Sequence, residues 1–189
     1  MLSFLRKPQI VCHGTKFNVP ERHEFWSALY NLAHARFYLV GKTNKSWINK
    51  NSEQRDAFAG AILRIISGGG QVRILSEPTE ETISDTQYFF SDCLIPELKR
   101  LPQLAKEQLV ARLERGLVYA VADNSHYRAV VSDDRLVFIP SLNSERFRDE
   151  ALVFELTRQS FPFGFHTYLS DIERMFDRES KHVPIKWDM

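Results

Sequence analysis

The chain has 189 residues, of which 43% are hydrophobic and 26% charged, a balance typical of a folded globular protein rather than a disordered chain. Its 25 basic and 24 acidic residues give a net charge of +1 at pH 7, which excludes the strongly basic signature of a protein that coats nucleic acid but leaves room for a local basic cleft. Cys12 and Cys93 are too few for a disulfide framework and lack the spacing of a zinc site.

The length of the chain indicates how many domains to expect, and the composition of its N-terminus indicates the cellular compartment. No internal repeat or linker divides the sequence, so we predict a single domain spanning residues 1–189. The N-terminus places basic residues after a very short apolar run, the reverse of a secretory signal. No stretch approaches the roughly 20 apolar residues of a membrane span. We therefore expect a cytoplasmic protein without membrane contact.

The first half of the chain predicts a strand–helix–strand unit. A helix opens at Pro20, and the compact apolar run 36–41 predicts a buried strand. Ser52 is a good N-cap for a second helix, which ends at Gly68–Gly70, and residues 71–76 form the next strand. Strand, helix and strand in this order form a right-handed unit with a parallel pair. The triple glycine follows a helix and precedes a strand, which favours a helix C-cap over a phosphate-binding loop.

The second half predicts helical structure over residues 85–115, broken at Pro96 and Pro102. Strands are expected at 117–122 and 151–156, and an amphipathic helix at 165–178. Together these elements predict an α/β fold, with a mixed, mostly parallel sheet flanked by helices on both faces.

A predicted hairpin between the last two regions carries the polar residues with the clearest chemical pattern. In the stretch H-Y-R-A-V-V-S-D-D-R-L-V-F-I-P-S-L-N, two short strands flank a tight polar turn. Because side chains alternate along a strand, His126 and Arg128 project to the same side, and Ser141 and Asn143 share a face in the same way. An imidazole, a guanidinium, a hydroxyl and an amide at one edge of a hairpin can bind an anion.

These 18 residues resemble the motif of the phospholipase D superfamily, H-x-K-x4-D-x6-G-S-x-N, with His126, Arg128, Asp133, Ser141 and Asn143 at its intervals. The sequence departs from the motif where Arg128 replaces lysine and Pro140 replaces glycine. Many members carry two copies of the motif, whereas this chain carries one, as in the small nuclease branch. The resemblance implies a phospholipase D-like fold.

The resemblance also implies a division of labour in phosphodiester cleavage. His126 would attack phosphorus, Arg128 and Asn143 would hold the non-bridging oxygens, and Ser141 would add a hydroxyl donor. A second histidine must protonate the leaving group, and it would be His126 of an identical subunit across a two-fold axis. The implied enzyme is a homodimer that needs no metal or other cofactor.

Carboxylates complete the predicted site. The family resemblance implies a structural role for Asp133, and an acid that stabilises the hairpin turn through its own backbone is an equally good interpretation. Glu150 is the first candidate to orient the imidazole, and Glu155 the second; either can instead be a solvated charge at the end of a strand.

The segment 42–51 is expected to be a polar loop. It combines Trp47 with Lys42, Lys45 and Lys50, a mixture that suits base stacking and phosphate contacts. Lys42 and Trp47 are therefore candidate substrate-binding residues, and a solvated loop without function is the alternative.

We predict a phosphodiesterase, with nucleic acid favoured over lipid as the substrate. The alternative is a catalytically degenerate domain that senses or binds a ligand or nucleotide within a regulatory or defence protein. The replacements at Arg128 and Pro140 favour this alternative, because an arginine fork binds phosphate but can misplace it, and proline supplies no N–H donor. An interaction module with an empty cleft, or a hairpin whose polar residues have no function, would also fit the sequence.

Overall fold

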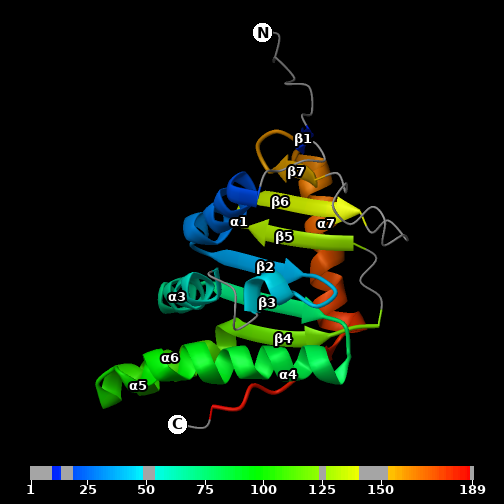
Figure 1. Cartoon of the computed structure of the whole chain (residues 1–189). Coiled ribbons are helices and arrows are strands. Elements are labelled where there is room, and N and C mark those ends of the chain that lie inside the picture. Colours follow the sequence, from blue (N-terminus) through cyan, green and yellow to red (C-terminus); the bar gives the residue numbers. More distant parts are fainter. Residues whose placement is uncertain (1–9, 14–18, 49–53, 124–126, 141–152, 188–189) are drawn as a thin grey trace.

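The computed structural model describes residues 10–13, 19–48, 54–123, 127–140 and 153–187. In this part of the chain eight strands form one mixed sheet, and helices cover both of its faces (Figure 1). The strands are β1 (Val11–His13), β2 (Arg36–Val40), β3 (Gln71–Ser76), β4 (Leu117–Val121), β5 (Tyr127–Ser132), β6 (Arg135–Pro140), β7 (Val153–Thr157) and β8 (Lys181–His182). The helices are α1 (Val19–Leu32), α2 (Lys45–Ile48), α3 (Gln54–Ser67), α4 (Glu80–Phe89), α5 (Ile95–Lys99), α6 (Gln103–Gly116) and α7 (Pro162–Arg174), with π-helical turns η1 (Phe90–Leu94) and η3 (Met175–Glu179). The predicted α/β class and the mixed sheet are confirmed.

The sheet order is β1-β7-β6-β5-β2-β3-β4-β8. Only β2 with β3 and β3 with β4 pair in parallel among the described strands, and the other five pairings are antiparallel. The expectation of a mostly parallel sheet is therefore corrected. The predicted β2-α3-β3 unit is present, but the two-residue turn between β5 and β6 forces an antiparallel hairpin, and this hairpin joins β2 in the antiparallel sense.

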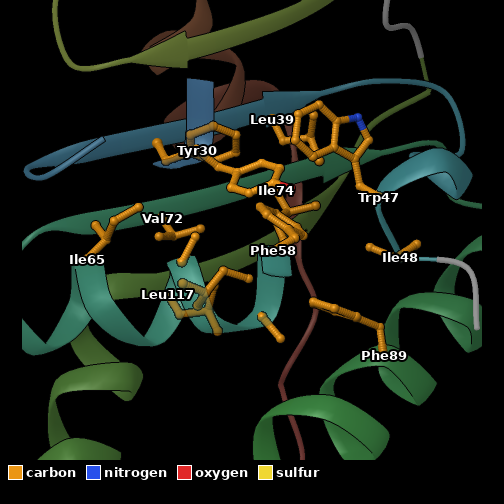
Figure 2. Close-up of a cluster of buried hydrophobic side chains, with 14 of the residues drawn as sticks. Tyr30, Leu39, Trp47, Ile48, Phe58, Ile65, Val72, Ile74, Phe89 and Leu117 are labelled. Carbon is orange, nitrogen blue, oxygen red and sulfur yellow. The ribbon is translucent and has the colours of Figure 1, made fainter. Parts of the chain in front are cut away.

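Alternating side chains divide the core between the two faces of the sheet. Along β2, Phe37 and Leu39 point into the larger apolar cluster beneath α1, α3, α4 and α6. Tyr38 and Val40 point the other way, into the cluster beneath α7 and η3. Figure 2 shows the larger cluster, in which Phe58 lies between the strand residues Leu39 and Ile74 and the helix residue Phe89. This two-sided burial fixes the register of the central strands.

The glycines after α3 form the predicted helix C-cap. Gly69 has φ 84° and donates its N–H to the Ile66 carbonyl at 3.0 Å, while Gly70 donates to Ile65 at 2.9 Å. This pair of hydrogen bonds is the Schellman arrangement. A Cβ at Gly70 would lie 2.8 Å from the carbonyl oxygens of His34 and Ala35, so glycine is also required for the close approach to β2.

The two prolines of the helical region behave differently. Pro102 separates α5 from α6 as predicted. The break predicted at Pro96 is wrong, because the helix continues through the π-helical turn η1, in which Ile95 donates its N–H to the Phe90 carbonyl five residues back. The wider turn relieves the clash between the Pro96 ring and the preceding carbonyls. Among the described helices, none has both the length and the apolar character needed to cross a membrane.

Candidate functional site

The candidate site lies at the edge of the sheet where β2, β3 and β4 end and where β5 begins. In the antiparallel register Val40 pairs with Ala129, Arg128 with Ile139, and Phe138 with Phe154. The start of β5, the end of β6 and the start of β7 therefore share this edge with the end of β2 (Figure 1). In the sequence, His126 directly precedes β5, Ser141 and Asn143 follow β6, and Glu150 precedes β7. These four predicted site residues lie outside the described part of the chain.

Arg128 is the one predicted motif residue at this edge that the structure describes. Its side chain is exposed, and the alternation along β5 places it on the same face as Val130 and Ser132. That face is the one covered by α1, because Ser132 donates its hydroxyl to the Leu29 carbonyl at 2.6 Å. Arg128 therefore lies at the candidate edge, on the face of the sheet that α1 covers. We call this part of the edge the rim.

Lys42 lies at the same edge, two residues beyond the end of β2. Its ammonium is 3.6 Å from the Glu77 carboxylate, and its side chain is 59% exposed. The Glu77 N–H donates to the Lys42 carbonyl at 2.9 Å, which holds the turns after β2 and β3 together. The structure thus brings Lys42 and Arg128 to one rim, with part of the lysine charge compensated.

A second ion pair joins Lys45, at the start of α2, to Glu81, in the first turn of α4. Lys45 donates to Glu81 at 2.5 Å, and this hydrogen bond raises the pKa of Lys45 and lowers the pKa of Glu81. Exposed pairs of this kind contribute little to stability. They do reduce the positive charge that the two lysines present to an anion.

Trp47 belongs to the core rather than to a solvated loop. It lies on the short helix α2, is 7% exposed and packs among aromatic rings (Figure 2). Its ring contacts are with Trp26, Tyr30, Phe37 and Phe58. A ring enclosed in this way cannot stack on a nucleic-acid base, so the expectation of a substrate-binding Trp47 is replaced by a packing role.

Asp133 has a structural role at the far end of the hairpin. Its carboxylate accepts hydrogen bonds from the backbone N–H groups of His34, Ala35 and Arg36 at 2.9, 2.9 and 2.8 Å. It follows Arg128 by five residues, or about 17 Å along an extended strand. The aspartate therefore ties the β5–β6 turn to the start of β2 and does not share the edge with Arg128.

Glu155, the second candidate to orient the histidine, is a buried carboxylate on β7. It is 8% exposed and accepts a hydrogen bond from Arg135 Nε at 2.7 Å. Sequence reasoning did not predict this partner, although both residues lie on the α1 side of adjacent strands. Glu155 lies two residues from the start of β7, whereas Arg135 begins β6 at the opposite end of the hairpin, so the ion pair points away from the candidate edge.

Sequence reasoning also missed Asn44, in the turn after β2. This residue adopts φ 52°, is 9% exposed and donates Nδ2 to the Leu75 carbonyl at 3.0 Å. A Cβ at Gly41 would collide with Asn44 Oδ1. The signal in the sequence was the polar composition of this turn. Asparagine is common in such turns because it tolerates positive φ better than most residues.

No protein-family model matches the sequence, and no curated protein is significantly similar to it. Solved structures do share its architecture. TrmBL2, an archaeal chromatin protein, superposes with a TM-score of 0.55 at 12% identity, covering 96% of this chain and 54% of TrmBL2, so the chain spans about half of that protein. Nuc from Salmonella typhimurium, a phospholipase D family member, gives a TM-score of 0.53 at 8% identity and covers 94% of this chain and 99% of its own. NucT from Helicobacter pylori gives 0.50 at 10% identity, with coverages of 93% and 99%.

The fold is phospholipase D-like. At these identities the likeness concerns architecture. The chain matches Nuc and NucT over nearly their whole length, so the phospholipase D-like architecture extends through the described sheet and its helices.

Proposed function

We propose that this chain is a phosphodiesterase of phospholipase D type that acts on nucleic acid. The observation that carries the proposal is the convergence of three strand ends. The motif residues flank β5, β6 and β7 in the sequence, and the described ends of these strands meet at one edge, beside the exposed Arg128. The fold is shared with Nuc, a phospholipase D family member.

In the proposed reaction, an imidazole nitrogen of His126 attacks phosphorus and the ester bond to the leaving oxygen breaks. Arg128 and Asn143 bind the non-bridging oxygens, Ser141 adds a hydroxyl donor, and Glu150 orients the imidazole. Water then attacks the phosphohistidine, which releases the phosphate product and restores the imidazole. Lys42 adds positive charge at the rim for a neighbouring phosphate.

The leaving oxygen needs a proton from a second histidine. With one motif per chain, we propose that His126 of an identical subunit supplies it, in a homodimer whose two-fold axis passes through the composite site. The mechanism uses only side chains of the protein, so activity is expected to survive a chelator.

Hydrolysis of single-stranded DNA, double-stranded DNA, RNA and a chromogenic phosphodiester, each in EDTA, tests the proposal. His126→Ala should lower the rate of hydrolysis at least about 1,000-fold, because it deletes the nucleophile. His34→Ala is the matched control, since His34 is exposed at the opposite edge of the sheet, and it should retain full activity. Equal activity in the wild type and His126→Ala would refute the assignment.

A second candidate function is nucleic-acid or ligand binding without turnover. It is favoured by the structural likeness to TrmBL2, a chromatin protein with a novel mode of DNA binding, and by arginine at position 128. Arg128→Lys separates the candidates: hydrolysis that rises strongly in the lysine variant marks the natural chain as a binding protein. If the natural arginine form hydrolyses the substrate as fast as the lysine variant or faster, the result supports the assignment as an enzyme.

A further inference from the structure

Three stacked aromatic rings lie on the face of the sheet that α7 covers, one residue inward from the candidate edge. Phe138 of β6 pairs with Phe154 of β7 and with Ala129 of β5, and Ala129 directly follows Arg128. The Phe138 ring stacks on Phe154 with centroids 5.2 Å apart and planes inclined by 18°. It also stacks on Tyr168 of α7, at 5.1 Å and 22°. We call Phe154, Phe138 and Tyr168 the aromatic ladder.

The helix α7 is held on the sheet mainly by other side chains. Phe165, Leu169 and Ile172 are 0%, 6% and 1% exposed and belong to the smaller apolar cluster. Tyr168, in contrast, is 38% exposed. Phe138 covers one face of the Tyr168 ring, so the exposed surface belongs to the rest of this side chain. The aromatic ladder therefore ends in a ring that solvent reaches.

The near-parallel planes distinguish the aromatic ladder from the ring pairs around Trp47. Those pairs meet at 56° to 73°, in the tilted and edge-on arrangements common in protein cores. Phe58 and Phe89 also stack, at 18°, but both are fully buried. Nucleobases stack on exposed aromatic side chains with parallel planes, because every base offers a flat π-face. A base on the outer side of Tyr168 would extend the aromatic ladder by one ring.

We propose that the aromatic ladder is a base-stacking platform, in which Tyr168 receives an unpaired base of a single-stranded nucleic acid. The choice of nucleic acid rests on the proposed function. Arg128 and Phe138 project from opposite faces of the sheet within one residue of the candidate edge, so a strand with a phosphate at Arg128 reaches the platform by crossing that edge. Asp171, one turn along α7 from Tyr168, is paired with Arg174 at 2.6 Å, which limits its repulsion of nearby phosphates.

The platform implies a preference for single strands. In a duplex the bases stack on one another, and taking one out of the stack costs free energy. An unpaired base is free to stack on Tyr168 without this cost. Stacking of this kind tolerates any base, so the preference concerns strandedness rather than sequence.

Oligonucleotides with and without bases test the platform, in a His126→Ala background that prevents cleavage during the titration. Tyr168→Leu keeps an apolar side chain against Phe138 but removes the ring, and it should weaken the affinity for oligothymidylate about tenfold, the loss expected for one stacked base. The same variant should bind an abasic oligonucleotide of equal length as tightly as its parent does, because this probe has phosphates and no base. Tight binding of the abasic probe also shows that the variant is folded.

Two further variants are the controls. Tyr168→Trp retains a ring and should retain the affinity for oligothymidylate. Phe163→Leu should change neither affinity, since Phe163 lies on the same helix, is 79% exposed and is outside the aromatic ladder. An equal loss for both probes in Tyr168→Leu, or no loss for oligothymidylate, would overturn the proposal.

Hydrolysis by the chain with His126 intact separates failure of the platform from failure of the proposed function. Cleavage of oligothymidylate in EDTA with the same KM in the wild type and Tyr168→Leu would support the enzyme and refute the platform. Binding of oligothymidylate through Tyr168 in a chain that cleaves nothing would support the platform and defeat the phosphodiesterase assignment. Binding of neither probe would refute both.

Discussion

Asp133 and Arg36 form a reciprocal pair of hydrogen bonds across two elements. The Arg36 N–H donates to the Asp133 carboxylate at 2.8 Å, and the Asp133 N–H donates to the Arg36 carbonyl at 3.0 Å. The same carboxylate caps the N–H groups of His34 and Ala35. The hairpin that carries Arg128 is therefore anchored to the central strand at the end away from the candidate site.

Asp133→Ala should lower the free energy of unfolding by about 2–3 kcal/mol. The variant loses an ionised acceptor shared by three backbone donors and strains the positive φ of 49° at this position. Denaturant unfolding measures the change. Asp134→Ala is the control, because Asp134 is 67% exposed and pairs only loosely with Arg158 at 3.3 Å, and it should cost less than about 1 kcal/mol. Equal losses in the two variants would contradict the anchoring role.

Trp47→Ala should destabilise the protein by about 3–5 kcal/mol, because it opens a cavity among four aromatic rings. Trp47→Phe should retain part of the packing and bind oligonucleotides as tightly as the wild type does. Unfolding curves and a binding titration measure the two effects. Tyr88→Ala, at a side chain that is 47% exposed, should change stability by about 0.5 kcal/mol or less. Loss of affinity in a stable Trp47→Phe variant would restore a substrate-binding role.

The burial of Trp47 shows which features of the fold local sequence patterns predict and which they do not. Apolar runs and glycine caps located β2, α3 and β3 because burial on two faces and helix termination are local properties. The strand pairing partners are not local, so the sheet was expected to be mostly parallel. Trp47 followed polar neighbours, and only the folded arrangement shows that Tyr30 and Phe58 enclose it.

The hairpin of the candidate site was predictable from its alternating apolar residues and polar turn, and β5 and β6 form it. The gathering of His126, Ser141, Asn143 and Glu150 at its edge stays a prediction, because these residues lie outside the described part of the chain. The Arg135–Glu155 pair depends on the register between β6 and β7, and the Asn44 oxygen depends on a turn that closes over Gly41. Both are long-range or conformational facts that spacing does not encode.

Arg135→Met should lower stability by about 2 kcal/mol, because it leaves the Glu155 carboxylate in a buried position without its guanidinium. This loss of stability is smaller than that expected on breaking a fully buried ion pair, because the Arg135 side chain is 31% exposed. The double variant Arg135→Met/Glu155→Leu should be more stable than the sum of the single losses predicts. Arg174→Met, which breaks the exposed ion pairs of Arg174 with Asp171 and Glu179, is the control and should cost less than about 1 kcal/mol. Additive single losses would show that Arg135 and Glu155 do not interact.

Stability should fall as the pH rises above about 9, in part because of Cys93. Burial raises the pKa of this thiol from 9.0 to about 11, so the unfolded chain loses the proton first. The folded state then binds more protons than the unfolded state, and the stabilisation present below pH 9 is lost as the pH rises toward 11. Burial also raises the pKa of Tyr30 and Tyr38, so the interval from pH 9 to 10 is the informative one. Denaturant unfolding at pH 8, 9 and 10 should show a smaller decline in Cys93→Ala than in the wild type, and equal declines would contradict the shifted pKa.

Mixing wild-type and His126→Ala subunits tests the composite site of the proposed homodimer. If each reaction needs His126 from both subunits, only dimers with two wild-type chains are active, and activity falls as the square of the wild-type fraction. An equal mixture that has exchanged subunits should then retain about one quarter of the activity, whereas independent subunits would retain about one half. Sedimentation at the assay concentration establishes the dimer, and an equal mixture of wild type and His34→Ala should retain full activity. A linear fall with the His126→Ala fraction would place the proton donor within a single chain.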